Sequence, residues 1–466
     1  MPAVDPKNRM NDLDSRTWLQ FQKSWFLSDN TLPLDDFIRF FTKSEYPDGH
    51  CGRIALYPVT LQTQVSARAA GKRQFVDALA GSSPLDYAFI DLRDLSSLEE
   101  LEARASELEK LFAALGNRLQ APAYLTVACR NWHKNGRSES VAWALARLLR
   151  KYFNQKDEKI GCASLVDTDA QEQEQTPTWQ PANNIIYFLQ FRNDFVPDNG
   201  GKPRPDVAKK EAVPLQAGTG AFRDGWFIHK PPPRSKQVLL HPAKFPEDLV
   251  QKFIETFTEA DEWVFDPMAG TGSSLVAALE VNRRACGIEL NPEFVDIART
   301  RYADSKRIVL VQGDARDARS YADLPPQLDY CITSPPYWDM LRMRGAETQA
   351  KRKAAGLQRW YSDDPHDLGN IAEYDRFLDL LEDVYRLTAE RLRPGRYMTI
   401  IVKNVKKKGE IYPLSWDIAD RLQNFLIFCG EQFWCQDDQR LAPFGYRYAW
   451  VSNTFHHYCL TFQKPL

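Results

Sequence analysis

The second half of the chain is predicted to form an α/β domain with a mostly parallel sheet. Three observations predict this fold: short apolar runs typical of strands, helical patterns between them, and turns at the strand ends. Such alternation covers both faces of a parallel sheet with helices. The final segment, 425–462, has the pattern strand, turn, strand, which predicts an antiparallel pair at one sheet edge. Strands are expected at 263–266, 285–289, 308–311, 328–332 and 397–402, and helices at 272–281, 292–302 and 373–392.

The first half also shows an α/β pattern, but one without residues of recognisable chemistry. A strand-like run at 85–94 precedes a capping box, Ser97 with Glu100, which opens a helix. No repeat of fixed period is found, which excludes solenoids and propellers. Further strands are expected at 123–130 and 185–191, a helix at 138–152, and a polar loop or disordered insertion at 167–184.

Length and composition predict two domains joined by a linker. A chain of 466 residues exceeds the usual size of one compact domain. Segment 198–234 is crowded with proline, glycine and charged residues, which cannot bury enough apolar surface to hold a core. We therefore expect an N-terminal α/β domain at 1–197, a linker at 198–234 and a second domain at 235–466.

Charge and cysteine usage narrow the classes of protein. The 60 lysines and arginines nearly balance the 62 acidic residues, so any nucleic-acid surface must be a local patch. The eight cysteines are scattered without metal-ligand spacing, which predicts buried reduced thiols and no metal. No apolar run reaches the roughly 18 residues of a membrane span. A cytoplasmic protein is expected.

The sequence VFDPMAGTGSS predicts a ligand site at a strand end. Gly270 and Gly272 permit a tight turn and a close approach of backbone N–H groups, and the following helix N-terminus favours electronegative groups. Glu289 ends the next strand about 20 residues later, where a carboxylate can accept two ribose hydroxyls. A purely structural turn is the alternative.

The acidic residues around this turn favour a cationic ligand. A dinucleotide or P-loop site fits worse, because the GxGxxG spacing and a Lys-Ser/Thr pair are both missing. Asp266, directly before the turn, would repel a pyrophosphate but suits a ligand carrying an ammonium and a sulfonium. Asp314, in VQGDA, can reach an adenine amino group or lie in a solvated turn.

At 333–337 the strand LDYCI runs into TSPPY, and here the sequence resembles the family of DNA amino-methyltransferases, whose catalytic motif is [DNS]PP[YF]. The turn at 266–272 matches a variant of the family's cofactor motif, and HPAKFP at 241–246 looks like the segment that closes over the cofactor. The resemblance covers about 236–466 and implies a Rossmann-like sheet that binds S-adenosylmethionine. The cofactor residues it implies are His241, Pro242, Phe245, Asp266, Pro267, Ala269, Gly270, Gly272, Glu289 and Asp314.

The resemblance makes Ser334, Pro335, Pro336 and Tyr337 the catalytic residues. An exocyclic amine of a base is a poor nucleophile because its lone pair is delocalised into the ring. The Ser334 side chain and the Pro335 carbonyl can accept both amino hydrogens, and consecutive prolines hold these acceptors rigidly. Tyr337 can stack on a flipped base, a contact worth roughly 1–3 kcal/mol. Without the cofactor motif, SPPY would be a tight turn.

Ser334 makes cytosine N4 the leading target, because serine at this motif position is associated with that amine in the family. Asparagine or aspartate there is associated with adenine N6 or with glutamine and guanine amines. Cytosine C5 methylation needs a Pro-Cys nucleophile, and no cysteine here follows a proline. The alternatives are an adenine-N6 methyltransferase, an RNA amino-methyltransferase and a catalytically silent DNA-binding subunit.

DNA recognition must lie outside the two motifs, because the roughly 60 residues between them are too few for a further domain. The N-terminal domain is expected to select DNA or bind a partner. The resemblance implies DNA modification at the nucleoid, beside a restriction or phage-defence system. Two basic segments, one of them mixed with tryptophans, are predicted to contact the DNA backbone, although solvated loops are the alternative. Their residues are Arg342, Arg344, Lys351, Arg352, Lys353, Lys406 and Lys407.

Overall fold

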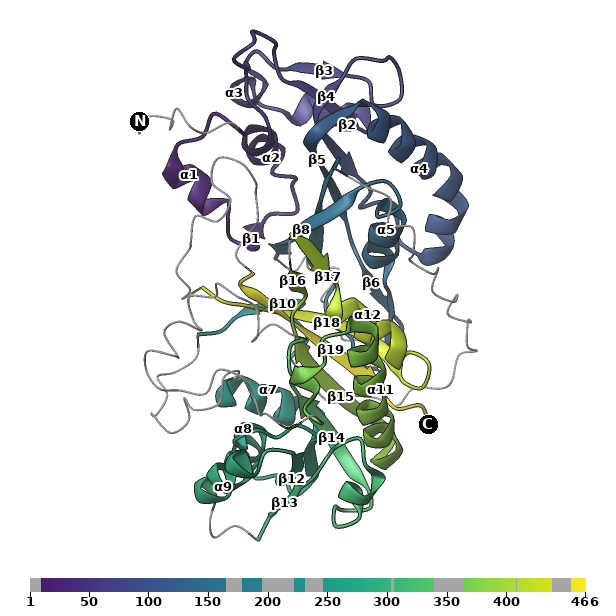
Figure 1. Ribbon diagram of the computed structural model, residues 1–466. Helices are drawn as coiled ribbons and strands as arrows, with labels where there is room; N and C mark the ends of the chain where they lie inside the picture. The colour runs from purple at the N-terminus through teal and green to yellow at the C-terminus, as the bar shows by residue number, and fades with distance from the viewer. Residues whose placement is uncertain are drawn as a thin grey trace.

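The computed structural model describes residues 10–164, 178–194, 222–230, 246–302, 306–338, 364, 366–407, 409–437 and 454–466. Two sheets divide it into a first half, shown in purple and blue in Figure 1, and a second half, shown from teal to yellow. The two halves lie one above the other, and their strands meet at the middle of the molecule (Figure 1). Among the described residues, no helix is long and apolar enough to cross a membrane.

The second half contains the predicted parallel sheet. Its strand order is β10-β18-β19-β15-β14-β11-β12-β13, in which the strands from β15 to β13 run parallel. The predicted C-terminal antiparallel pair is confirmed as β18 and β19. The pair does not form the sheet edge, because β10, inside the predicted linker, pairs with β18. The strands are β10 (Trp226–Ile228), β11 (Trp263–Asp266), β12 (Arg284–Glu289), β13 (Ile308–Gln312), β14 (Leu328–Thr333), β15 (Leu392–Val402), β18 (Ile427–Cys435) and β19 (His456–Gln463).

Helices cover both faces of this sheet, as the alternation of its apolar residues requires. Phe265 and Cys331 belong to the apolar cluster that contains the buried face of α11, whereas Val264 and Tyr330 belong to the cluster that contains α7 and α8. Each strand therefore sends successive side chains into two cores. The helices are α7 (Glu247–Phe257), α8 (Ser273–Glu280), α9 (Pro292–Arg301), α11 (Tyr374–Arg391) and α12 (Leu414–Leu422), with 3-10 turns η3 (Ala318–Tyr321) and η5 (Leu368–Asn370).

The first half is also α/β, as predicted, with the strand order β1-β8-β9-β5-β4-β2-β3. The predicted cap of α4 is present, since the Ser97 side chain accepts a hydrogen bond from the Glu100 N–H. Its strands are β1 (Trp25–Ser28), β2 (Arg53–Tyr57), β3 (Gln74–Val76), β4 (Leu85–Asp91), β5 (Leu119–Cys129), β8 (Asn154–Ala163) and β9 (Ile185–Arg192). Its helices are α1 (Ser15–Gln20), α2 (Leu34–Phe41), η1 (Val59–Gln64), α3 (Ala67–Ala70), α4 (Leu98–Arg118) and α5 (Val141–Leu149).

Each half also carries a short hairpin that packs on the other half. The hairpin of the first half, β6 (Trp132–Lys134) with β7 (Arg137–Glu139), lies against β18. The hairpin of the second half, β16 (Val405–Lys407) with β17 (Glu410–Tyr412), lies against β8. Cys162 Sγ of the first half and Cys435 Sγ of the second half lie 3.8 Å apart. All eight cysteines lie in the described part of the chain as free thiols, Cys51 half-buried and the others buried.

Candidate cofactor and catalytic site

Asp266, the last residue of β11, ties the predicted cofactor turn to the predicted catalytic motif. Its Oδ1 accepts hydrogen bonds from the Thr333 hydroxyl at 2.7 Å and from the Met268 N–H at 3.0 Å. Its Oδ2 accepts from the Ser274 hydroxyl on α8 at 2.6 Å. Burial raises the pKa of Asp266 above its usual range, while these donors oppose the shift. Asp266 therefore holds the ends of β11 and β14 together.

The glycine turn adopts the backbone that its sequence predicts. Gly270 and Gly272 have positive φ angles of 54° and 77°, and Gly272 directly precedes α8. A Cβ added at Gly272 would lie 3.0 Å from Ala298 Cβ on α9. On the neighbouring strand, a Cβ at Gly287 would lie 3.0 Å from Ala269 Cβ. Glycine is therefore required both for the turn and for its close packing against β12.

Glu289 stands at the end of β12 and faces the turn. Its Oε2 accepts from the Gly270 N–H at 2.7 Å, and its Oε1 accepts from the Asn291 N–H at 2.8 Å. Burial raises the pKa of Glu289 to about 7, against the opposing effect of these two backbone donors. Each carboxylate oxygen keeps a second lone pair. The arrangement can therefore accept two hydroxyl groups from a ligand in the adjoining pocket.

Asp314 follows β13 and is held by its neighbour Arg316. The guanidinium donates from Nε to Oδ1 at 2.9 Å and from Nη2 to Oδ2 at 2.6 Å. Burial alone would raise the pKa of Asp314, but the Arg316 guanidinium and backbone N–H hold it below its usual value. Arg316 also donates to the carbonyl of His366, which brings the segment before η5 to the strand ends. Asp314 thus presents a fixed, ionised carboxylate to the pocket.

The SPPY segment, 334–337, directly follows β14, the strand that pairs with β11. Ser334 is half-buried, whereas Tyr337 is 9% exposed and Trp338 3% exposed. Burial raises the pKa of Tyr337 to about 12, with a hydrogen bond to Ser334 opposing the shift. The tyrosine is therefore neutral over the physiological pH range and can offer an uncharged ring to a base.

Of the two predicted lysines that the structure describes, only Lys407 lies near this segment. Its Nζ lies 4.1 Å from the ring centroid of Trp338, which also contacts the rings of Tyr374 and Tyr412. The Nζ of Lys406 contacts Asp157 Oδ1 at 2.5 Å, at the boundary with the first half. The structure thus places the two lysines in different surroundings.

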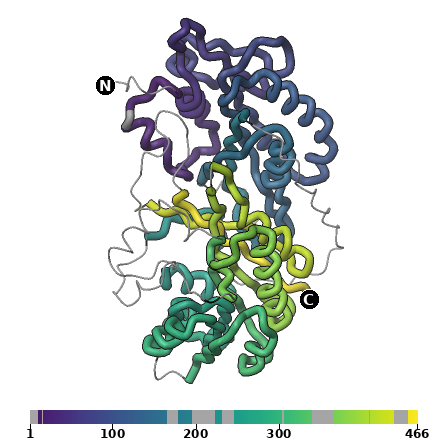
Figure 2. The backbone as a smooth tube through the Cα atoms, in the orientation of Figure 1, coloured from purple at the N-terminus to yellow at the C-terminus, as the bar shows by residue number. Residues whose placement is uncertain are grey.

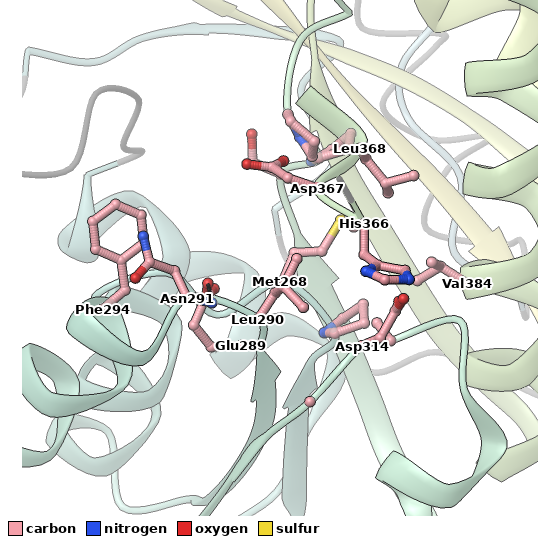
Figure 3. A pocket seen from close by; sticks show the side chains of 16 residues that line it. Met268, Glu289, Leu290, Asn291, Phe294, Asp314, His366, Asp367, Leu368 and Val384 are labelled. Carbon is pink, nitrogen blue, oxygen red and sulfur yellow. Dashed lines mark hydrogen bonds between the residues drawn. The ribbon is translucent and has the colours of Figure 1, made fainter. Parts of the chain in front are cut away.

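One pocket collects six of the predicted residues from four strand ends, whereas Asp266, Ala269, Gly270, Gly272 and Tyr337 do not line it. Its cavity volume is about 100 Å³, and the cavity opens to solvent. Pro267 comes from the glycine turn, Glu289 and Asp314 from the next two strands, and Ser334, Pro335 and Pro336 from the catalytic motif. Figure 3 shows Glu289 and Asp314 with residues that sequence reasoning missed: Met268, Leu290, Asn291, Phe294, His366, Asp367, Leu368 and Val384.

The missed lining residues come from segments that carry only weak local signals. Asn291 caps α9 by accepting from the Glu293 N–H at 2.9 Å, and its Asn-Pro sequence indicated a helix start rather than a ligand contact. Asp367 caps η5 and is 7% exposed. The carboxylates of Glu289, Asp314 and Asp367 line the pocket together with the apolar side chains of Phe294 and Leu368. Such a lining fits a cationic nucleoside, which has hydroxyl donors and an apolar base surface.

Several predicted residues lie outside the described residues. Among the cofactor candidates these are His241, Pro242 and Phe245, and among the DNA-contact candidates they are Arg342, Arg344, Lys351, Arg352 and Lys353.

Comparisons with known proteins match this chain in part. A family model described as DNA methylase matches residues 120–300. The type II methyltransferase M.BglII of Bacillus subtilis is 26% identical over 136 residues, which cover 28% of this chain and 35% of that protein. The putative methylase YubD of Escherichia coli K12 is 42% identical over 77 residues, covering 16% of this chain and 34% of that protein.

Two further comparisons complete this picture. The type II methyltransferase M.Cfr9I of Citrobacter freundii is 36% identical over 94 residues, covering 20% of this chain and 30% of that protein. The chain thus spans about a third of the length of these curated relatives. Among solved structures, TrmN from Thermus thermophilus matches with a TM-score of 0.32 and 13% identity, over 60% of this chain and 57% of that one.

Proposed function

Because this chain belongs to the family of S-adenosylmethionine-dependent DNA amino-methyltransferases, we propose that it methylates the exocyclic N4 amine of cytosine in DNA. The observation that carries the proposal is the single pocket lined by both the glycine turn and the SPPY motif. Asp266 holds the two motifs together through Thr333. A methyl donor and a target amine can therefore meet in one place.

The pocket residues divide into cofactor-holding and target-holding groups. Glu289 would accept the ribose hydroxyls, Asp314 would face the adenine amino group, and Phe294 with Leu368 would pack on the apolar surface of the base. His241, Pro242 and Phe245 remain proposed for the methionine end. When bound, S-adenosylmethionine supplies an electrophilic methyl group, which the amine takes with release of S-adenosylhomocysteine and one proton.

The target-holding residues would activate the amine by orientation. Ser334 Oγ and the Pro335 carbonyl would accept its two hydrogens and turn its lone pair toward the methyl group. Pro335 and Pro336 fix this backbone, and Tyr337 would stack on a base flipped out of the duplex. Serine rather than aspartate at position 334 favours cytosine N4 over adenine N6.

We further propose how the rest of the chain supports this reaction. Residues 1–197 would help to select DNA or bind a restriction or defence partner, 198–234 would link the domains, and 235–466 would catalyse the reaction in the cytoplasm, at the nucleoid. Lys407, next to Trp338, would contact the DNA backbone beside the flipped base. The same role is proposed for Arg342, Arg344, Lys351, Arg352, Lys353 and Lys406.

The target base can be tested by digesting treated DNA to nucleosides and identifying the methylated one by mass spectrometry. We expect N4-methylcytosine from the wild type and none from Ser334→Ala. N6-methyladenine would refute the cytosine assignment while retaining the reaction class. Methylated RNA with unmodified DNA would refute DNA as the substrate.

A further inference from the structure

The two sheets of the molecule have the same strand order, with corresponding strands at corresponding places. In the first half β1-β8-β9-β5-β4-β2-β3 follows the same path as β10-β18-β19-β15-β14-β11-β12 in the second. The helices and hairpins also correspond, because α4, β6-β7 and α5 occupy the chain positions of α11, β16-β17 and α12. The second sheet differs by one added edge strand, β13.

The strand registers agree to the residue. Tyr124 on β5 pairs with Tyr87 and Arg192, just as Tyr397 on β15 pairs with Tyr330 and Gln463. Both sheets shift register at the same place, directly after Leu85 in one and Leu328 in the other. A second shift follows Gln155 on β8 and Phe428 on β18.

The sequences at equivalent places retain traces of identity. Both β4 and β14 begin with Leu-Asp-Tyr, and both β1 and β10 begin with Trp-Phe. The match to the DNA methylase family model also begins in the first half, at residue 120 in β5. It covers the rest of that half and then continues into the second half, past the glycine turn. Shared topology, register and sequence together indicate two copies of one fold.

The two copies contact each other through the same surface. Glu158 of the first half accepts from Asn404 Nδ2 at 2.9 Å and from the Tyr458 hydroxyl at 2.8 Å. Reciprocally, Glu431 of the second half accepts from Asn131 Nδ2 at 2.9 Å and from the Tyr187 hydroxyl at 2.8 Å. The rings of Trp143 and Trp416, one from each half, stack with their centroids 5.8 Å apart. Such reciprocity is the signature of a twofold interface between like subunits. Figure 2 shows the backbones of the two halves meeting across the middle of the molecule.

The first copy lacks the chemistry of the second at the equivalent catalytic position. Counting from Leu-Asp-Tyr, Asp91 stands where Ser334 stands, and Leu-Arg-Asp replaces Pro-Pro-Tyr. The Arg93 guanidinium donates to the Asp91 carboxylate, from Nε to Oδ1 at 2.8 Å and from Nη2 to Oδ2 at 3.0 Å. The Asp91 carboxylate is therefore paired within the first half. This half also lacks the two prolines and the tyrosine ring at the equivalent positions.

The equivalent cofactor position is altered in the same way. By strand register, the buried Leu56 is at the position equivalent to Asp266. The 3-10 turn η1 then follows, where the second half has the glycine turn and the eight-residue helix α8. Register also places Leu79, which is 55% exposed, where Glu289 stands. The residues that would recognise a sulfonium nucleoside are therefore replaced in the first copy.

We propose that the first half is a divergent copy of the methyltransferase fold that has lost its cofactor and target sites and takes the place of a second subunit. The chain then acts as a monomer with one working site, a conclusion that rests on the proposed function of the second half. In the part of the chain that the structure describes, each half uses this surface to contact the other half, so a second chain would have to bind elsewhere.

Calorimetric titration with S-adenosylhomocysteine and light scattering of the full chain test this proposal. We expect one binding site per chain and the mass of a single chain. Glu289→Gln and Asp91→Asn make the same carboxylate-to-amide change in opposite halves. The first should weaken binding at least tenfold, whereas the second should leave both affinity and stoichiometry at wild-type values.

Two sites per chain, or loss of binding in Asp91→Asn, would overturn the assignment of a silent first half. A stable dimer of chains would overturn the claim that this half replaces a subunit. If the wild type bound no S-adenosylhomocysteine, the proposed function and the single working site would both fail. The mass measurement would still decide separately whether the interface is internal.

Discussion

The Glu289 carboxylate is expected to make cofactor binding depend on pH near neutrality. Burial raises the pKa of Glu289 to about 7 in the ligand-free pocket. Ribose hydroxyls that donate to this carboxylate would favour its ionised form and lower its pKa, so binding would release a proton. Affinity should therefore be highest above this pKa and fall as the pH drops through it.

The magnitude follows from the size of this shift. If the bound-state pKa lies well below about 6, affinity for S-adenosylhomocysteine should fall roughly tenfold from about pH 8 to about pH 6, or ~1.4 kcal/mol. Isothermal calorimetry at several pH values measures this dependence directly, and repeating it in buffers of different ionisation enthalpy counts the released proton.

Two amide variants of the same pocket distinguish the effect of Glu289 on the pH dependence of binding from that of Asp314. Glu289→Gln should bind more weakly and lose the pH dependence, since its amide nitrogen would face the N–H of Gly270 or Asn291 and cannot accept it, at a cost of about 1–3 kcal/mol. Asp314→Asn should keep the wild-type slope, because the pKa of Asp314 is already lowered by Arg316. A wild-type affinity that is flat across this range, or a slope that survives in Glu289→Gln, would refute the reasoning.

Three further substitutions test the turn, the link between the motifs and the internal interface. Gly272→Ala should lower the thermal unfolding temperature and weaken S-adenosylhomocysteine binding, because the left-handed backbone costs alanine ~1–2 kcal/mol and its Cβ would crowd Ala298; unchanged unfolding would contradict this. Thr333→Val removes the hydrogen bond to Asp266 and should lower kcat more than cofactor affinity, with a stability loss of about 1–3 kcal/mol; steady-state kinetics with denaturant unfolding measures both. Tyr187→Phe and Tyr458→Phe should each reduce the free energy of unfolding by a similar ~1–2 kcal/mol, and a loss in only one of them would argue against equivalent halves.

Much of the second half could be predicted because its strands and helices carry strong local patterns. The predicted strand 263–266 matches β11, and the predicted helix 373–392 matches α11 to within a residue at each end. The strands are apolar where they are buried on both faces, and β11 and β12 end at the acidic residues Asp266 and Glu289. The pocket position of Glu289 could likewise be expected, because parallel strands bring their carboxyl ends to one sheet edge.

Elements at the boundary between the halves could not be predicted from local pattern. β8 has the polar sequence NQKDEKIGCA, yet Asp157 and Glu158 are 0% and 1% exposed because partners in the other half satisfy them. The short hairpins β6-β7 and β16-β17 depend in the same way on packing across the boundary. This burial depends on contacts between residues far apart in the chain, so the local sequence does not predict it.

The duplication escaped the sequence analysis for a related reason. A search for a fixed short period finds solenoids, whereas here one fold occurs twice, and α9 and β13 are inserted in the second copy between matching segments. The remaining signal was the pair LDYAFID and LDYCITS, which differ where the chemistry differs. The role of Asp266 also needed three dimensions, because its donors Ser274 and Thr333 arrive from separate elements.

The most direct test of the central claim is transfer of a tritiated methyl group from S-adenosylmethionine to DNA by the full chain. The proposed site predicts label on an exocyclic amine of DNA with the wild type, and at least about a hundredfold less with Ser334→Ala, a loss of ~2.7 kcal/mol in transition-state stabilisation. Ser334→Ala should still bind S-adenosylhomocysteine normally. Wild-type protein that binds the cofactor but leaves DNA unlabelled, or equal labelling by both proteins, would contradict the account.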